Sequence, residues 1–198
     1  ASGRGKTEAG LNFGLSRFYI YRTTDKGLPG YGNYDRYAVA GPSFNDELVL
    51  VNHSEHWYRL KNEGSFALFV FHPSNAGGHW TIKLKDGQEI QLGTSEESQQ
   101  WGTGPNRQGV ARWFAALQTD VDGHRIAYDY TQHRGHVYLS QISYQNPNFA
   151  TDTYHNRVVF NYDAQNRPDS FTDFTYGFED RTQWRLERAK IESHLRTK

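Results

Sequence analysis

The sequence predicts an all-β fold in which antiparallel hairpins form a large curved sheet or a sandwich-like module. Short apolar or aromatic runs recur along the 198 residues, and turn-forming residues separate them. Aromatic residues also make up 15% of the chain, and such rings favour strands. The length suits one domain with a real core, so we expect a single unit of short strands.

The strongest hairpin signal lies within residues 112–144. Two turn dipeptides, Asp122-Gly123 and Arg134-Gly135, each precede a segment with period-2 alternation, and the first predicts a tight type I′ reversal. The alternating positions are Ile126, Tyr128 and Tyr130 after the first turn, and Tyr138, Ser140, Ile142 and Tyr144 after the second. Both segments are therefore expected to be strands of antiparallel hairpins.

We expect a strand wherever such a run lies between two turn signals. In chain order the expected strands are Arg17–Tyr21, Tyr37–Ala40, Glu47–Asn52, His56–Leu60, Phe66–Phe71, Trp80–Lys85, Glu89–Leu92, Arg112–Thr119, Arg125–Tyr130, Val137–Tyr144, Val158–Tyr162 and Phe171–Phe178. Trp184–Leu195 fits both a strand and a helical stripe, and the β-like residues before it favour the strand. The polar stretch Thr94–Gly109 predicts a loop.

Alternation within the strands indicates how the sheet is covered. The strand at Trp80–Lys85 predicts one buried face and one solvated face. Its buried positions are Trp80, Ile82 and Leu84, and its solvated positions are Thr81, Lys83 and Lys85. Phe66–Phe71 is apolar on both faces, so we expect this strand to be central or covered on both sides.

Charge and composition exclude several classes of function. The 22 basic and 22 acidic residues cancel, so no broad electrostatic field favours nucleic acid as a partner. No apolar run approaches the roughly 20 residues that span a bilayer, so we expect no membrane insertion by this segment. Absence of cysteine excludes disulfides and thiolate chemistry. Absence of methionine leads us to expect a fragment of a larger protein.

Several motifs follow one another along the chain. They are YRTTDKGLP at Tyr21–Pro29, DRYAVAG at Asp35–Gly41, WTIKLKDGQEIQLG from Trp80, Arg112-Trp113 leading to Asp122-Gly123 and Tyr128-Asp129-Tyr130, then Tyr138-Leu139, Ile142-Ser143-Tyr144, Arg167-Pro168-Asp169 and Tyr176-Gly177-Phe178-Glu179. This ordered set, spanning Phe13–Ile191, resembles the SpvB/TcdB-type N-terminal domain of insecticidal toxin complex B components and related Salmonella virulence plasmid B proteins.

The resemblance implies a scaffold and not a reaction. It implies a module of a secreted bacterial toxin whose YD/Rhs-like strands help to build an Rhs-type shell around a toxic C-terminal segment. Partners would be other domains of the parent toxin or a partner toxin component, and catalysis such as ADP-ribosylation would lie in another domain. The chain would be secreted, after a time in the cytoplasm before export. Residues 1–12 would be a disordered or truncated N-terminal edge, and 13–198 one SpvB-like β domain.

The residues to which we assign a role within this scaffold are structural. They form the turn and strand motif of Asp122, Gly123, Tyr128, Asp129, Tyr130, Tyr138 and Leu139. The alternative is an independent carbohydrate-binding β-sandwich that uses exposed aromatics, with Trp101 in the loop that would contact the ligand. Glu96 and Glu97 lie near Trp101, but a solvated loop explains these two acids better than sugar hydrolysis does.

The sequence offers few other candidates for chemistry. His53 and His56, like His133 and His136, are three residues apart, a spacing that presents two metal ligands on a helix but not in strands or turns. We therefore expect surface or turn histidines, with no metal and no cofactor. The segment GRGKT at residues 3–7 lacks the first glycine and the preceding strand of a phosphate-binding loop, and a disordered terminus is expected there.

Overall fold

The computed structural model describes residues 19–23, 29–31, 35–41, 44–62, 64–101, 109–144, 154–163 and 167–193. All regular secondary structure in these ranges is β-strand, which confirms the predicted all-β class. The expected edge at residues 1–12 and the GRGKT segment lie outside the described residues. In the part described, no helix is long and apolar enough to cross a membrane.

Fifteen strands are assigned in these ranges. They are β1 (Tyr19–Thr23), β2 (Arg36–Ala40), β3 (Asn45–Asn52), β4 (Trp57–Leu60), β5 (Leu68–His72), β6 (His79–Lys83), β7 (Glu89–Leu92), β8 (Gln99–Trp101), β9 (Val110–Thr119), β10 (Arg125–His133), β11 (His136–Tyr144), β12 (Asn156–Asp163), β13 (Phe171–Asp173), β14 (Asp180–Thr182) and β15 (Arg185–Ser193). Most of the predicted strands are found within a few residues of their predicted ends.

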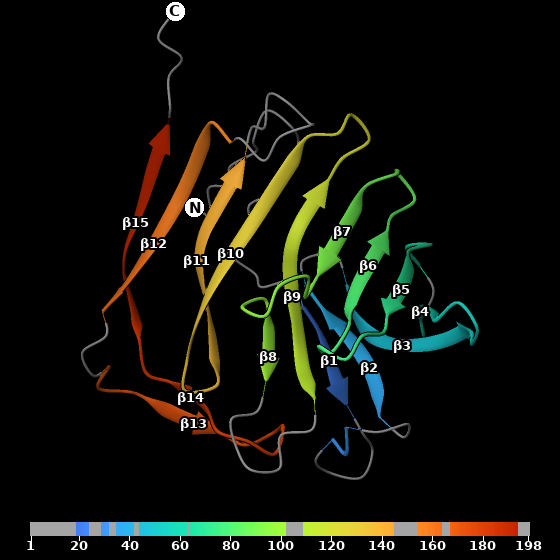
Figure 1. Cartoon of the computed structure of the whole chain (residues 1–198), viewed down its shortest axis with the longest axis horizontal. Helices are drawn as coiled ribbons and strands as arrows, with labels where there is room; N and C mark the ends of the chain where they lie inside the picture. Colours follow the sequence, from blue (N-terminus) through green and yellow to red (C-terminus); the bar gives the residue numbers. More distant parts are fainter. Residues whose placement is uncertain are drawn as a thin grey trace, which may run out of the picture.

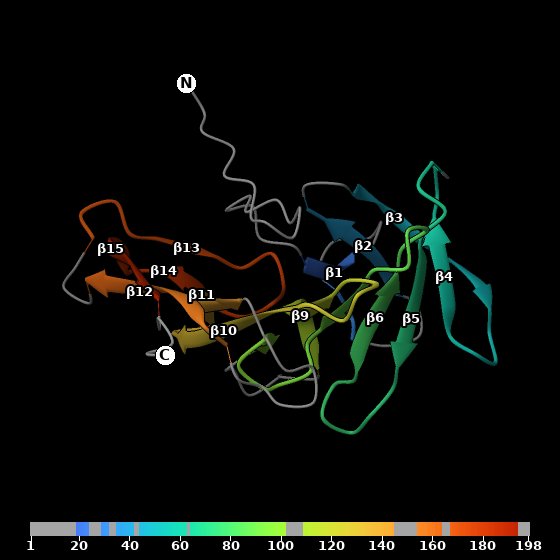
Figure 2. The ribbon, with the colours of Figure 1, turned by 90° about the horizontal axis from the view of Figure 1, so that it is seen from above.

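The first seven strands and β9 form a closed, barrel-like sheet (Figures 1 and 2). Each strand from β1 to β7 pairs with the next in antiparallel fashion, and β9 completes the circuit. Ala115 of β9 lies opposite Leu92 of β7, and Phe114 lies opposite Tyr19 of β1. The long β9 therefore contacts both ends of the run of strands and closes it.

An open sheet continues from the C-terminal end of β9 (Figure 1). Residues Leu117–Thr119 pair with the start of β10, and β11, β12 and β15 follow in that order. The two short strands β13 and β14 form a separate sheet at one end of this extension. The molecule is thus a closed sheet and an open sheet that share β9.

Three apolar clusters correspond to these parts. The closed sheet holds the main core of Ile20, Val39, Phe44, Leu48, Ala67, Phe69, Trp80, Ile82, Ile90, Leu92, Val110, Trp113 and Ala115. Ile126, Ile142 and Phe160 form a smaller core on the open sheet. Tyr176 and Phe178, which follow β13, pack against Ala111 of β9. The rings of Tyr37, Trp80 and Trp113 pack edge to face within the closed sheet, so large side chains fill this part of its interior.

The two hairpin turns differ from the prediction. At Asp122-Gly123 only the glycine has a positive φ, of 83°, so the predicted type I′ reversal is wrong. Gly123 N donates to Asp120 O at 3.1 Å and Asp120 N donates to His124 O at 3.0 Å, which is a type I turn closed by a glycine bulge. The type I′ geometry occurs instead at Arg134 and Gly135, with φ of 47° and 73°.

The predicted loop at Thr94–Gly109 contains a strand, β8. Gln99 and Gln100 belong to this polar stretch, and both are buried. Gln99 Nε2 donates to the carbonyl oxygens of Gly78 and Gly93, at 2.9 and 2.7 Å. The amide can be buried because the fold supplies backbone acceptors that the local sequence does not reveal.

Two apolar segments are also shorter as strands than predicted. β5 does lie between β4 and β6, but Phe66 precedes it with a φ of 55° and is 61% exposed, so this position is not covered. The predicted strand Phe171–Phe178 ends at Asp173, because Gly177 N donates to Phe174 O at 2.9 Å and the chain turns. The turn lets Tyr176 and Phe178 reach the closed sheet.

Contacts with neighbouring strands explain the outcome of two further predictions. Thr81 was expected on a solvated face, yet it is buried because the His72 side chain contacts its hydroxyl at 3.0 Å. The ambiguous C-terminal segment is a strand, as preferred, since β15 pairs with β12 along its length.

Candidate functional site

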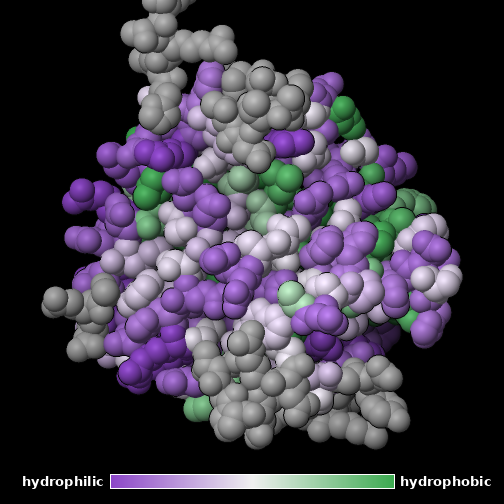
Figure 3. Space-filling view, in the orientation of Figure 1, coloured by the Kyte–Doolittle hydropathy of each residue, from purple (hydrophilic) through white to green (hydrophobic). Residues whose placement is uncertain are grey.

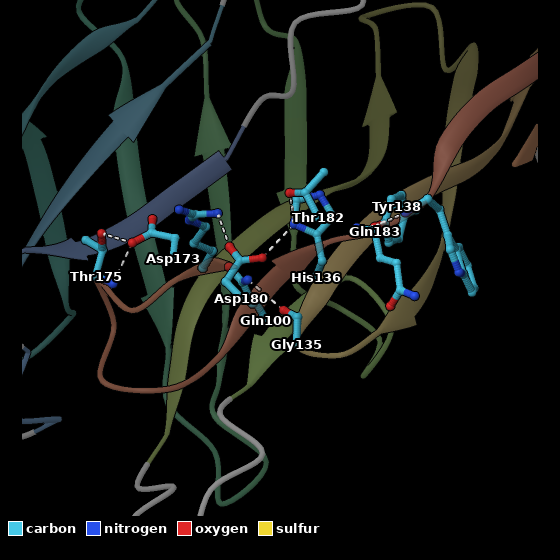
Figure 4. A network of polar contacts seen from close by, with 11 residues as sticks. Gln100, Gly135, His136, Tyr138, Asp173, Thr175, Asp180, Thr182 and Gln183 are labelled. Carbon is cyan, nitrogen blue, oxygen red and sulfur yellow. Dashed lines mark hydrogen bonds and ion pairs between the residues drawn. The ribbon is translucent and has the colours of Figure 1, made fainter. Parts of the chain in front are cut away.

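The most connected group of buried polar side chains lies where β8, β9, β11 and β14 meet (Figure 4). We call Gln100, Arg112, His136, Asp180 and Thr182 the polar cluster. Asp180 is 6% exposed, and its two oxygens lie 3.3 Å from Arg112 Nη1 and 2.6 Å from His136 Nδ1. A carboxylate is stable at this depth only because cations and donors surround it.

The polar cluster keeps Asp180 ionised. Burial alone would raise the pKa of this carboxyl, but hydrogen bonds from His136 and Gln100, with the charges of His136 and Arg112, outweigh burial and lower the pKa. Two buried atoms of the cluster, Gln100 Oε1 and Arg112 Nε, have no hydrogen-bond partner among the described residues. These two residues are cross-strand partners in β8 and β9.

The turn between β10 and β11 forms one wall of the cluster. Gln100 Nε2 donates to Gly135 O at 2.7 Å, and Arg181 N donates to Arg134 O at 3.1 Å. A Cβ at Gly135 would lie 2.0 Å from Glu179 O, so only glycine allows the chain before β14 to approach this closely. The turn dipeptide of the sequence therefore serves tertiary packing as well as chain reversal.

Arg112 extends the cluster to the aromatic residues beside β1. Its guanidinium carbon lies 4.5 Å from the ring centre of Tyr176 and 5.6 Å from that of Tyr19. Tyr31 donates its hydroxyl to Tyr176 O at 2.6 Å. The segment that joins β13 to β14 is thus attached to the closed sheet by charge, by ring contacts and by hydrogen bonds.

A second buried ion pair lies close by. Arg22 Nη1 is 3.4 Å from Asp35 Oδ2, and Arg22 Nε donates to Val110 O at 2.7 Å. The guanidinium lies about 5.5 Å from the ring centres of three aromatic residues, namely Tyr31, Tyr37 and Trp113. Asp35 also accepts from Gly30 N at 2.9 Å. This pair connects the YRTTDKGLP and DRYAVAG motifs, a role that no local pattern predicts.

The predicted structural residues are distributed over the open sheet. Asp122 and Gly123 form the β9–β10 turn, and Asp129 is exposed. Tyr128 donates its hydroxyl to Gln118 Oε1 at 3.3 Å, and Tyr130 donates to Ala115 O at 2.5 Å, so both side chains connect β10 with β9. Leu139 O accepts from Tyr162 at 2.7 Å. These residues do not form one site.

Tyr138 is the one member of the predicted set that adjoins the polar cluster (Figure 4). Its hydroxyl accepts from Gln183 N at 2.9 Å and from Trp184 N at 3.0 Å, and its ring lies 5.0 Å from that of Trp184. It therefore fixes the chain between β14 and β15. A tyrosine in an alternating pattern signals a strand, but not this long-range contact.

The histidines occupy different environments. His53 is exposed and His56 adopts a positive φ in the β3–β4 turn, as expected of surface or turn residues. His133 stacks on Trp184 with 4.6 Å between ring centres. His136 is buried, so the expectation of a surface position is wrong for it, because Asp180 satisfies its ring nitrogen.

The candidate ligand residue Trp101 ends β8 and borders a cavity of about 340 Å³. Its indole Nε1 donates to Gln99 Oε1 at 2.8 Å. Glu96 and His79 also line this cavity, whereas Glu97 does not. A separate exposed group at the β9–β10 turn, Asp120, Asp122 and His124, places its ligand atoms within 4.8 Å of one another, and no ligand is indicated there.

The fold and these contacts define an all-β domain in which buried polar groups hold distant strands together. The chain belongs to the SpvB family, described as Salmonella virulence plasmid 65kDa B protein, whose model matches residues 1–162. The resemblance seen in the sequence motifs is therefore confirmed.

Solved structures share the fold. The N-terminal domain of the effector protein SpvB from Salmonella typhimurium strain LT2 is similar with a TM-score of 0.77 and 18% identity, over 98% of this chain and 81% of that one. A TcdB2-TccC3 structure gives 0.73 and 20%, over 89% and 11%. The Photorhabdus luminescens Tc holotoxin pore gives 0.73 and 18%, over 90% and 11%. No curated protein sequence matches significantly.

Proposed function

We propose that this chain is a non-enzymatic structural module of a secreted bacterial toxin, and that its strands contribute to a shell that encloses or delivers a toxic C-terminal segment. Family membership and the fold shared with an effector domain and with Tc toxin chains support this proposal. This chain spans 11% of the length of those Tc chains, so the shared fold is a small part of each of them. Residues 13–198 would act as one module.

The observation that carries the proposal is the open end of the sheet. β15 has nine residues, and all except Glu192 are exposed. Among the described residues its outer edge pairs with no strand. Leu186 and Ile191 are 46% and 73% exposed on it. A long edge strand with exposed apolar side chains is a site where a further strand can add.

A second surface points to the same conclusion. The outer half of β3 extends beyond the residues that pair with β2, and Val49, Leu50 and Val51 are all exposed there. Trp57 of β4 is exposed beside them. Figure 3 shows apolar surface on the right-hand side, where β3, β4 and β5 lie in Figure 1. Contiguous apolar surface of this kind is typical of protein contacts.

The buried polar groups favour a structural role over catalysis. Asp180, His136 and Arg112 bind one another and lie against β14, so they hold a strand in place and present no reacting atom to a substrate. Partners would accordingly be other domains of the parent toxin or a partner toxin component. Secretion follows from the toxin role, with a cytoplasmic stage before export.

Hydrogen exchange of the backbone amides of β15 tests the proposal. We expect fast exchange in the 198-residue chain and slow exchange when the same segment is part of the complete parent toxin. Ile191→Asp should remove the protection in the parent, whereas Val121→Asp, at an equally exposed turn position away from the edge, should not. Unchanged exchange of β15 in the parent, or substrate turnover by the isolated chain, would overturn the proposal.

A further inference from the structure

The cavity beside Trp101 lies between two loops of the closed sheet, the one from β5 to β6 and the one from β7 to β8. Its volume of about 340 Å³ is within the range of sites that hold small molecules. The residues that line it include Trp101, His79, Glu96 and the hydroxyl-bearing Thr94 and Ser95. Apolar and polar groups therefore face the same space.

Gln99 gives this cavity a fixed shape. One side chain connects the two loops, because its Nε2 donates to Gly78 O at 2.9 Å and to Gly93 O at 2.7 Å. The other end of the amide accepts from Trp101 Nε1 at 2.8 Å and so sets the orientation of the indole. Pre-organised walls reduce the entropy that a ligand must offset on binding.

Gly77 allows the indole to lie where it does. Its φ is 88°, and a Cβ there would lie 2.8 Å from Trp101 Cζ2 and 2.2 Å from Val110 Cγ2. Any other residue would displace the ring or the loop. The positions of both the loop and the ring thus depend on a backbone that only glycine tolerates.

Two titratable groups are free to meet a ligand. In the ranges described, neither the carboxylate of Glu96 nor the imidazole of His79 hydrogen-bonds to the protein; His79 only stacks on His72, with 4.5 Å between ring centres. Burial first and His72 second lower the pKa of His79, so the ring is neutral at pH 7. Among the described residues that line the cavity there is no lysine or arginine. This part of the wall therefore disfavours anions and offers both donors and acceptors.

We propose that this cavity binds a neutral sugar ring. The indole of Trp101 would contact the apolar face of the ring, and Glu96 and His79 would hydrogen-bond to its hydroxyl groups. A polyhydroxylated ring matches the walls because one of its faces is apolar while its rim both donates and accepts. This inference is independent of the proposed function, since a structural module does not require a ligand.

The test begins with a glycan array probed with the 198-residue chain, followed by titration of the best binder. We expect Trp101→Ala and Glu96→Gln each to weaken binding at least about tenfold, which is about 1.4 kcal/mol. Trp57→Ala removes an exposed tryptophan outside the cavity and is the matched control, with no change expected. Glu96 is exposed, so its variant reports on binding even where Trp101→Ala impairs folding.

Nuclear magnetic resonance locates the bound sugar. The indole N–H signal of Trp101, assigned by its loss in Trp101→Phe, should shift on addition of the sugar while that of Trp57 stays in place. Absence of any glycan that binds at millimolar concentration would overturn the inference. So would equal effects of Glu96→Gln and Trp57→Ala, or binding of a cationic amine in place of sugars.

Discussion

Replacing Asp180 with alanine should destabilise the domain more than any exposed carboxylate does. The substitution removes the carboxylate that faces Arg112 and His136, whose nitrogens lie 3.3 and 2.6 Å from it, and leaves the largely buried guanidinium of Arg112 without its counter-ion. Breaking a buried ion pair from one side costs about 3–5 kcal/mol. For a domain of this size a loss of about 4 kcal/mol lowers Tm by about 8–16 °C.

Urea unfolding at pH 7, followed by circular dichroism, measures this loss. Asp129→Ala is the matched control, because Asp129 is exposed and accepts one hydrogen bond, from Gln141 at 3.1 Å; we expect its effect to stay within about 0.5 kcal/mol. The slope of the unfolding free energy against urea concentration should equal that of the unsubstituted chain, because the native state stays compact. A loss below about 1 kcal/mol, typical of solvated ion pairs, would refute the reasoning.

A double-mutant cycle shows whether the loss belongs to the polar cluster. Arg112→Met combined with Asp180→Ala should cost clearly less than the sum of the two single changes, because Arg112 and Asp180 contact each other. Strict additivity would mean that Asp180 acts through some other contact.

Three further outcomes follow from the same contacts. The pKa of Asp180 lies below its ordinary value of 3.8. The stability that its carboxylate supplies is therefore complete above pH 3.8 and is lost as the pH falls through the lower pKa of the folded state. Asp180→Asn should reduce this loss of stability at acid pH when unfolding is measured as a function of pH. Gly135→Ala forces a Cβ to 2.0 Å from a carbonyl oxygen and should cost about 2 kcal/mol or more, whereas Gly64→Ala, with nothing within 4 Å, should be nearly neutral in the same assay. Tyr138→Phe removes the acceptor of two backbone N–H groups and should cost about 1–3 kcal/mol, with faster proteolysis between β14 and β15 as a second readout; an unchanged Tm would contradict the contact.

The sequence predicts local structure well because its signals are local. Period-2 alternation identifies β10 and β11, and glycine at position 123 marks the turn between β9 and β10. β8 escapes prediction because its two glutamines resemble loop residues until the fold supplies carbonyl acceptors for them. Closure of the sheet cannot be predicted either. Tyr19 and Phe114 are paired although they lie far apart in the sequence, and nothing in the residues between them indicates which residues of β1 and β9 face each other.

The candidate site shows the same limit. Arg112 and Asp180 are 68 residues apart, and neither lies in a motif with a known chemical spacing, so only the folded chain brings them together. The sequence suggests Trp101 because an aromatic ring in a polar loop can stack on a sugar, yet the cavity beside it depends on Gln99 and on a glycine from another loop. The residue types in the sequence can suggest a residue that contacts a ligand, but they cannot predict which residues form the cavity around it.

The polar cluster matters most for the angle between the two sheets. The backbone ladder between β9 and β10 has three residue pairs, at Leu117–Thr119, so the ladder that joins the closed sheet to the open sheet is short. Side-chain hydrogen bonds from Tyr128 and Tyr130 to β9 add to it. Gln132 on β10 adds a contact by donating to Gln99 O at 2.6 Å. Asp180 then joins β9 and β11 through Arg112 and His136. Buried charges add little net stability compared with apolar packing, but a buried ion pair is stable only when its partners are held in one relative arrangement. The cluster therefore fixes the direction in which the open sheet, and with it the edge of β15, leaves the closed sheet.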